Sequence, residues 1–351
     1  MMPISQTKLA EHTRVLITGG CGFIGVNLVE NLLKEEGRFI RIVDNLSVGS
    51  KDDLAQVCDF KVTSPAQLNS EIQGHNSEIN KKELSAGVEL VIGDILDADL
   101  ALLASQNIDV IIHLAANTGV GPSLENPRSD CYTNVIGTLN YLEAGRINSV
   151  KRFVFASSGA PVGECRPPIH EEIPAHPVSP YGASKLAGEG YCSAYFRSFD
   201  LETVALRFGN VYGTYSSQKN SVVAKFIKRA LENNPLEIYG DGTQTRDFIF
   251  VGDLVNAITL ATTAKGAPGE TFQIATNSET TVNELAEKLT SILRTFGFDH
   301  IKIKNSEARR GDVKRNYSDI SKAKTLLNWQ PENDLTTGLQ KTVEWFIKQT
   351  P

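Results

Sequence analysis

Two residues that could move protons together, Tyr181 and Lys185, stand four positions apart in the segment 179–185. At a predicted helix start this spacing places both side chains on one face. A free phenol has a pKa of about 10, but a neighbouring ammonium group favours the phenolate and lowers that pKa. The pair could therefore take a proton from a hydroxyl group and return it. The plain alternative is a half-exposed helix face, so the interpretation depends on the surrounding residues.

Two serines supply the next part of this arrangement. Ser157 and Ser158 directly follow an apolar run at 152–156 that reads as a strand. In a parallel sheet, ligands bind at the carboxyl ends of the strands. A hydroxyl there could hydrogen-bond the oxygen whose proton Tyr181 handles, although turn-forming or helix-capping serines are common.

A glycine cluster near the N-terminus predicts a binding site for a dinucleotide cofactor. Gly19, Gly22 and Gly25 follow the apolar run 14–18 and open a helix-like stretch. Such glycines permit a tight turn, close approach of a pyrophosphate to the helix N-terminus, and close helix–sheet packing. Asp44 ends the next strand, close to the ~20-residue separation expected for a group that binds the adenosine ribose. A carboxylate would repel a 2′-phosphate, so NAD is predicted rather than NADP; a simple turn with a capping Asp is the alternative.

The elements that must position these residues alternate along the chain. Short apolar runs that read as strands occur at 14–18, 39–43, 88–92, 110–114, 152–156 and 203–207, and helix-like stretches occur at 22–34 and 134–146. Strands that are apolar throughout and alternate with helices indicate a parallel sheet covered on both faces. The prediction is an α/β fold, a Rossmann-type doubly wound parallel sheet, with residues 47–87 as an irregular surface excursion.

The pattern loosens after about residue 210, with turn signals at 239–242 and 266–269. We interpret this part as a smaller C-terminal substrate-binding lobe that the chain enters more than once. The expected NAD-binding domain is 12–209 plus about 244–270. The expected substrate lobe is about 210–243 plus 271–351, closed by a terminal helix around 335–347.

Composition excludes several classes of function. The net charge of −6 predicts no binding to nucleic acid or to an anionic membrane surface. The five dispersed cysteines and a polar N-terminus without a signal-like apolar run predict reduced thiols in the cytoplasm. No run is long enough for a membrane helix, and the six histidines form no HxxH or HxxxH pair, so no metal site is predicted.

The combined motifs resemble the extended short-chain dehydrogenase/reductase superfamily. Within it, the chain is similar to the NAD-dependent epimerase/dehydratase family, and most similar to the UDP-sugar 4-epimerases. The resemblance runs from about residue 13 to the C-terminus. It rests on the segments 18–25, Asp44-Asn45, Gly93-Asp94-Ile95, 113–116, Ser157-Ser158 and Tyr181 with Lys185.

The resemblance implies a mechanism and a set of contacts. Tyr181 would exchange the proton of the sugar 4-hydroxyl, Lys185 would hold the nicotinamide ribose, and Ser158 would position the substrate, while NAD carries the 4-hydride. The implied cofactor-binding residues are Gly19, Gly22, Phe23, Ile24, Gly25, Asp44, Asn45, Asp94, Ile95, Ala115, Ala116, Asn134, Tyr181, Lys185 and Phe208. The implied substrate-binding residues are Ser157, Ser158, Asn210, Val222, Tyr239, Arg246, Arg309, Asp312 and Asn316.

Two departures from the family pattern bear on the reaction. In the resembling family, dehydratases and UDP-glucuronate decarboxylases have a Glu at the position that matches Gly159 of this chain. Without that acid/base group, simple epimerisation is favoured. Asn316 stands where the family often limits pocket size, and its small side chain favours room for an N-acetylated or C6-oxidised hexose.

The sequence thus predicts C4 epimerisation of a UDP-hexose of the UDP-glucose, UDP-GlcNAc or UDP-glucuronate class through a transient 4-keto sugar. A dehydratase, decarboxylase or reductase on the same scaffold remains open, as does a non-catalytic NAD-binding protein, and dTDP is not excluded. The family resemblance also implies a homodimer through the helices near 134–146 and 181–197.

Overall fold

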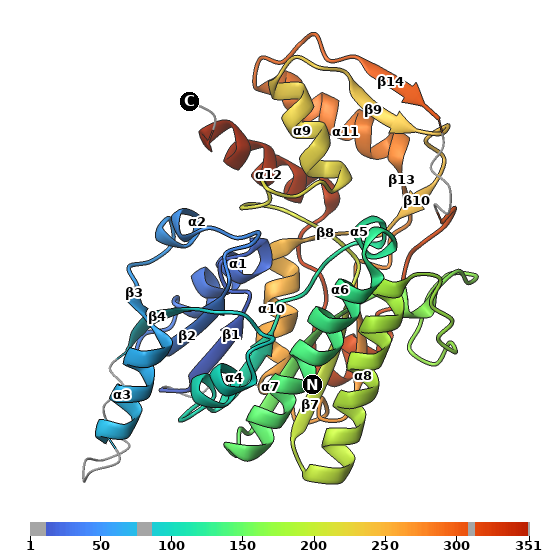
Figure 1. Ribbon diagram of the computed structural model, residues 1–351. Helices are drawn as coiled ribbons and strands as arrows, with labels where there is room; N and C mark the ends of the chain where they lie inside the picture. Colours follow the sequence, from blue (N-terminus) through green and yellow to red (C-terminus); the bar gives the residue numbers. More distant parts are fainter. Residues whose placement is uncertain (1–11, 76–85, 308–312, 350–351) are drawn as a thin grey trace, which may run out of the picture.

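The computed structural model describes residues 12–75, 86–307 and 313–349 (Figure 1). Its centre is an eight-stranded sheet in the order β12-β7-β6-β5-β1-β2-β4-β3. Every pairing in this sheet is parallel. The strands are β1 (Arg14–Thr18), β2 (Phe39–Asp44), β3 (Lys61–Thr63), β4 (Gly87–Ile92), β5 (Val110–His113), β6 (Arg152–Ser158), β7 (Glu202–Phe208) and β12 (Thr271–Ile274). The Rossmann-type doubly wound sheet predicted from the sequence is confirmed.

The strand order reverses beside β1. From β1 the chain runs outward through β2 to β4 on one side, and β5, β6 and β7 follow on the other. A crevice forms at such a reversal, at the carboxyl ends of the strands, and ligands of doubly wound sheets bind there. The glycine turn follows β1 and Ser157-Ser158 ends β6, so both motifs lie at this edge of the sheet.

Both faces of the sheet are buried because the strand residues alternate between two cores. Val15 and Ile17 belong to one hydrophobic cluster, together with residues of α1 and α10, whereas Leu16 belongs to the other, together with residues of α4, α7 and α8. The helices that pack on the sheet or extend from its edges are α1 (Phe23–Leu32), α2 (Lys51–Ala55), α3 (Pro65–His75), α4 (Ala98–Ala104), α5 (Val120–Glu125), α6 (Pro127–Cys131), α7 (Gly137–Ile147), α8 (Pro180–Phe199) and α10 (Val251–Ala261). Two short turns complete this part, the π-helix η1 (Tyr132–Ile136) and the 3₁₀ helix η2 (Ala160–Val162).

A smaller group of elements lies above the carboxyl edge of the sheet in Figure 1. It contains α9 (Val222–Leu231), β9 (Leu236–Tyr239), α11 (Val282–Thr295), β14 (Ile303–Ser306) and α12 (Leu335–Gln349). Four short strands in two pairs connect it to the sheet region: β8 (Asn210–Tyr212) pairs with β11 (Phe248–Phe250), and β10 (Thr245–Arg246) pairs with β13 (Thr280–Thr281). The π-helix η3 (Ala323–Leu327) precedes α12.

The structure corrects two expectations about the sheet. Residues 47–87 were expected to be irregular, yet they contain α2, α3 and the edge strand β3, which pairs with β4. The segment from residue 271 was expected in the smaller lobe, but Thr271–Ile274 pairs with β7 as the opposite edge strand. Both strands are short and contain polar residues, so neither has the fully apolar pattern of a central strand.

Candidate active site

Helix α8 carries the predicted proton-transfer pair. Ser179 caps its N-terminus by accepting a hydrogen bond from the Gly182 N–H (3.1 Å), and Pro180 occupies the first turn. This start places Tyr181 in the first turn and Lys185 one turn later. Lys185 is 2% exposed; its Nζ donates to the Ala156 carbonyl (2.9 Å) and lies 4.9 Å from the centre of the Phe155 ring. The ammonium group is therefore held against the end of β6.

Burial dominates the acid–base properties of this pair. It raises the pKa of the Tyr181 phenol, and the hydrogen bond with Ser158 opposes that rise. Burial also lowers the pKa of Lys185 to about 8, although the Asp130 carboxylate nearby acts in the opposite direction. The structure does not show the lowering of the Tyr181 pKa that we expected from the Lys185 ammonium: burial and Asp130 raise that pKa, and the opposing effect comes from Ser158. Forming the phenolate requires further positive charge close to the ring.

The two serines at the end of β6 point to opposite faces, as successive strand residues must. Ser158 interacts with Tyr181, and its Oγ accepts a hydrogen bond from the Ala160 N–H (3.2 Å). Ser157 is 3% exposed, and its Oγ donates to Glu189 Oε1 (2.5 Å). Its hydroxyl is therefore buried against α8 and lines none of the three cavities, so a contact of Ser157 with substrate stays a prediction.

Behind Tyr181 and Lys185 lies a buried ion pair that was not predicted from the sequence. Glu189, one turn after Lys185 on α8, accepts two hydrogen bonds from the Arg207 guanidinium (2.8 and 2.7 Å), and both side chains are almost fully buried. Such a forked contact fixes the orientation of both groups. It locks α8 to β7 and β6 and so sets the position of Tyr181 and Lys185.

A second buried network surrounds Asn134 in the π-helix η1. Its Nδ2 donates to the Asn117 carbonyl (3.0 Å), to Asp130 Oδ1 (3.1 Å) and to Ser184 Oγ (3.1 Å), and its Oδ1 accepts from the Asn117 N–H (2.8 Å). Asn134 is 1% exposed and does not line the dinucleotide cavity, so its predicted contact with the cofactor stays a prediction. It holds the Asn117 loop, which does line that cavity, against α8.

His113, at the end of β5, has a fixed protonation state. Thr138 Oγ1 donates its proton to the Asn134 carbonyl (2.7 Å), so Thr138 Oγ1 can only accept from His113 Nε2 (3.2 Å). The proton of the neutral ring therefore lies on Nε2, and His113 Nδ1 accepts from Thr18 Oγ1 (2.9 Å). Burial and the nearby Lys185 ammonium lower the pKa of His113 to about 3. The ring is thus a neutral structural link between β1, β5 and α7.

This histidine should make the fold sensitive to acid. Its folded-state pKa of about 3 lies below the unfolded value of about 6.5, so the unfolded chain binds more protons and stability falls as the pH drops below ~6.5. Between pH 7 and pH 5 the loss due to His113 should reach about 2 kcal/mol. Urea unfolding at pH 7 and pH 5 should show that His113→Gln loses less unfolding free energy between these pH values than the original protein. The control His300→Gln, which changes an exposed histidine, should lose as much as the original protein. An equal loss in His113→Gln would refute this assignment.

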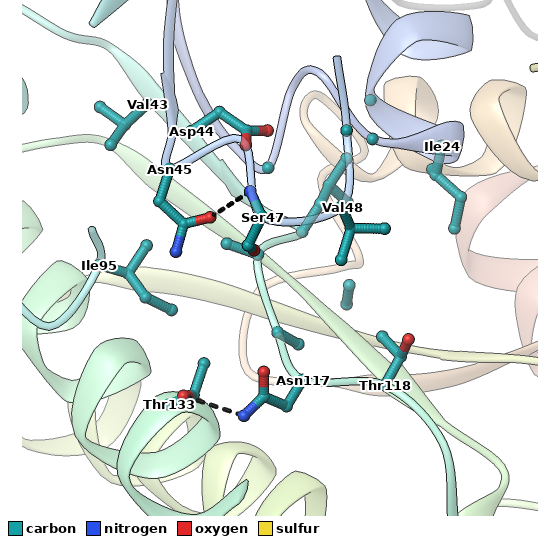
Figure 2. A pocket seen from close by; sticks show the side chains of 18 of the residues that line it. Ile24, Val43, Asp44, Asn45, Ser47, Val48, Ile95, Asn117, Thr118 and Thr133 are labelled. Atoms are coloured by element: carbon teal, nitrogen blue, oxygen red, sulfur yellow. Dashed lines mark hydrogen bonds between the residues drawn. The ribbon is translucent and has the colours of Figure 1, made fainter. Parts of the chain in front are cut away.

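The glycine turn and its neighbours enclose a cavity of about 190 Å³ (Figure 2). Gly19 has φ +74°, and a Cβ there would approach the Ala115 backbone nitrogen to 2.8 Å. A Cβ on Gly25 would lie 2.4 Å from the Gly19 carbonyl oxygen, so both glycines are needed for packing. Of the residues predicted to contact the cofactor, the following line this cavity: Gly19, Gly22, Phe23, Ile24, Gly25, Asp44, Asn45, Asp94, Ile95, Ala115 and Ala116.

This cavity has the chemistry that a dinucleotide requires. Helix α1 has no side-chain cap at Gly22 and no acidic residue in its first turn, so its first N–H groups can receive a phosphate. Asp44 accepts hydrogen bonds from the Cys21 and Leu46 N–H groups (2.9 and 2.8 Å), which fixes its carboxylate at the cavity wall. Burial nevertheless raises the pKa of Asp44. Asn45 Nδ2 donates to Asp94 Oδ2 (2.8 Å), and both side chains line the same cavity as Asp44.

Two further cavities, of about 410 and 470 Å³, open between the sheet edge and the smaller group of elements. Asn210 and Arg246 line both of them. Val222 and Tyr239 line the first; Ser158, Phe208 and Asn316 line the second. Phe208 was predicted to contact the cofactor and here borders the neighbouring cavity. Arg309 and Asp312, predicted to bind substrate, lie outside the described residues.

The residues that contact Tyr181 and Lys185 line two of the cavities, although Tyr181 and Lys185 themselves line none of the three. Ala156, which accepts from Lys185, lines the dinucleotide cavity, and Ser158, which interacts with Tyr181, lines the 470 Å³ cavity. In the described part of the chain, no group of three or more His, Cys, Asp or Glu side chains is placed to hold a metal ion. None of the helices in the described residues is long and apolar enough to span a bilayer.

A Rossmann-type sheet with a glycine turn after β1, an Asp at the end of β2 and a Tyr–Lys pair at the carboxyl edge is typical of the dinucleotide-dependent short-chain dehydrogenase/reductase class. Residues 15–275 match the model of the NAD dependent epimerase/dehydratase family. The chain belongs to that family, which confirms NAD as the predicted cofactor.

Relatives cover nearly the whole chain. A UDP-glucose 4-epimerase of Mycolicibacterium smegmatis is 36% identical over 95% of this chain and 98% of its own length. The crystal structure of a Thermotoga maritima UDP-glucose 4-epimerase with UDP-glucose is similar, with a TM-score of 0.82 and 32% identity over 97% of this chain and all of that one. A UDP-N-acetylglucosamine 4-epimerase from Methanobrevibacter ruminantium, solved with UDP-N-acetylmuramic acid, has a TM-score of 0.83 and 30% identity over the same shares.

Proposed function

We propose that this protein interconverts the C4 epimers of a UDP-hexose through a transient 4-keto sugar. The observation that carries the proposal is the position of Tyr181 and Ser158. Ser158, which interacts with Tyr181, borders the 470 Å³ cavity, and Ala156, two residues before it on β6, borders the dinucleotide cavity. The similarity to UDP-sugar 4-epimerases over nearly the whole chain supports the same reaction.

The residues divide the work as follows. Tyr181 takes the proton of the sugar 4-hydroxyl and returns it after the sugar has turned, and Ser158 holds that hydroxyl in line. Lys185 keeps a positive charge beside the site and is fixed by the Ala156 carbonyl. Bound NAD would supply an acceptor and donor for the C4 hydride, and the positive charge of its ring would favour the phenolate of Tyr181 against the effect of burial.

The lining of the 470 Å³ cavity favours return of the hydride over elimination. Of the side chains that line the 470 Å³ cavity in the described part of the chain, none is a carboxylate. A Cβ on Gly159 would meet no atom within 4 Å, so nothing else fills the space that an acid/base side chain would need. With no second acid/base group beside the sugar, loss of water or of CO₂ lacks a catalyst.

The nucleotide diphosphate would be held by the residues shared between the two outer cavities. Arg246 Nη1 donates to the Val313 carbonyl (2.7 Å), which anchors the guanidinium between them, and Asn210 lies beside it. Val222 and Tyr239 would face the nucleoside, and Arg309 and Asp312 would complete the grip. Asn316 would lie next to the hexose and leave room for an N-acetyl or C6-carboxylate group.

A substrate panel tests the proposal. The protein should be incubated with UDP-glucose, UDP-GlcNAc and UDP-glucuronate, and with dTDP-glucose as the nucleotide comparison, without added NAD(H). We expect NMR to show a C4 epimer of unchanged mass from at least one UDP-sugar. Loss of water or CO₂ would instead identify a dehydratase or decarboxylase. No turnover of any sugar would favour a non-catalytic NAD-binding protein.

We also propose a homodimer through α7 and α8 in the cytoplasm. Apolar side chains are exposed along these helices and the preceding η1, namely Tyr132, Ile136, Ile147, Tyr191 and Phe199. Sedimentation velocity should show a dimer, and Ile136→Glu should shift it towards monomer; a monomer in the original protein would contradict the proposal. The free thiols of all five cysteines fit a reducing compartment.

A further inference from the structure

A loop from the smaller group of elements reaches the dinucleotide cavity. It connects β8 to α9 over residues 213–221 and carries Lys219. Lys219 lines the 190 Å³ cavity together with the glycine turn. It lines neither of the two outer cavities, although its neighbours Asn220 and Ser221 line one of them. The lysine therefore faces the cofactor side of this loop.

The loop is fixed to helix α1, the helix that the glycine turn opens. Thr214 Oγ1 donates to Asn27 Oδ1 (2.7 Å), and Asn27 Nδ2 donates back to the Thr214 carbonyl (3.0 Å). At its other end, Lys228 of α9 donates to the Ser217 and Lys219 carbonyls (3.0 Å each). These contacts hold the Lys219 backbone at a set distance from the glycine turn.

The charge of Lys219 has no partner within the described residues. No carboxylate there pairs with its ammonium group, and burial lowers its pKa. The cavity's own carboxylates are engaged elsewhere, since Asp44 accepts from backbone N–H groups and Asp94 accepts from Asn45. A partly buried cation without a counter-ion is costly, and an anion bound beside it would remove that cost.

The cavity offers one place for such an anion. The N-terminus of α1 has no side-chain cap, so its N–H groups attract negative charge, and Asp44 and Asp94 mark the opposite, ribose-binding end. We propose that Lys219 binds the diphosphate of the dinucleotide and thereby ties the β8–α9 loop to the cofactor. This inference rests on NAD binding but not on the proposed epimerisation.

The test is NAD affinity, measured by calorimetry on protein freed of nucleotide. Lys219→Gln should weaken NAD binding roughly 10-fold or more, the range of a charge-assisted contact, and Lys219→Arg should stay within about 3-fold of the original. The exposed Lys265→Gln serves as the matched control and should bind NAD normally. Circular dichroism and the thermal midpoint of each variant report whether the fold is intact.

Three further ligands separate the possible roles. ADP-ribose carries the same diphosphate without nicotinamide and should lose affinity by the same factor in Lys219→Gln, whereas adenosine, which lacks phosphate, should lose none. UDP should bind all variants equally. Unchanged NAD affinity in Lys219→Gln would overturn the proposal, as would an equal loss for adenosine. A loss confined to UDP would assign Lys219 to the substrate diphosphate instead. None of these results depends on whether a sugar is turned over.

Discussion

Replacing Tyr181 by Phe should lower kcat on the responsive UDP-sugar by roughly 10³-fold or more, because it removes the oxygen that interacts with Ser158 and that we propose takes the proton of the sugar hydroxyl. General acid–base groups contribute about 10²–10⁴-fold to rates, and here no second group at the cavity wall can replace the phenolate. The Phe ring fills the same space, so the fold and NAD binding should be retained. Initial rates with saturating substrate, together with NAD affinity, measure both effects.

Tyr191→Phe is the matched control, since it removes the same oxygen from the same helix. Tyr191 is 39% exposed and lines none of the three cavities; it belongs to the proposed dimer face, where Phe keeps the apolar ring. Its kcat should remain within about 2-fold of the original, well inside the variation that surface substitutions produce. Residual activity of Tyr181→Phe close to that of Tyr191→Phe would remove Tyr181 from the proposed chemistry.

Replacing Glu189 by Ala should produce the largest loss of stability. Arg207 would keep its charge while buried without the carboxylate that accepts two of its N–H groups, and Ser157 would lose its acceptor. Removing one partner of a buried ion pair costs about 3–5 kcal/mol. Urea unfolding followed by circular dichroism measures this difference, and the variant should also lose activity because α8 shifts.

The exposed pair of Lys61 and Glu71 provides the comparison. Both side chains are largely in solvent, so Glu71→Ala should change the unfolding free energy by no more than about 1 kcal/mol. If Glu189→Ala cost no more than Glu71→Ala, the buried pair would not be what holds α8 in place.

Local patterns in the sequence were enough to predict the centre of the fold. The glycine turn, Asp44 and the apolar strands follow from local rules, because a central parallel strand is apolar throughout and a phosphate-binding turn needs glycine at set positions. The edge strands at 61–63 and 271–274 were not predicted because an edge position tolerates polar residues.

The site was predictable where spacing along one element decides it, as for Tyr181 and Lys185 on α8. It was not predictable where the partner comes from a distant segment. Glu189 with Arg207, Asn134 with Ser184, and Lys219 beside the glycine turn have no signature in the sequence, since only the folded chain brings them together. The hydrogen bond of Ser157 to Glu189 was not predictable either, because the face to which this side chain points depends on the strand register.

The most direct test of the central claim follows the C4 hydrogen. The protein, without added NAD(H), should be incubated in ordinary water with the responsive UDP-sugar deuterated at C4. If the same cofactor removes and returns the hydride, the epimer should keep its deuterium at C4 and the water should gain none. Exchange of the C4 label with solvent, or release of water from the sugar, would contradict the account.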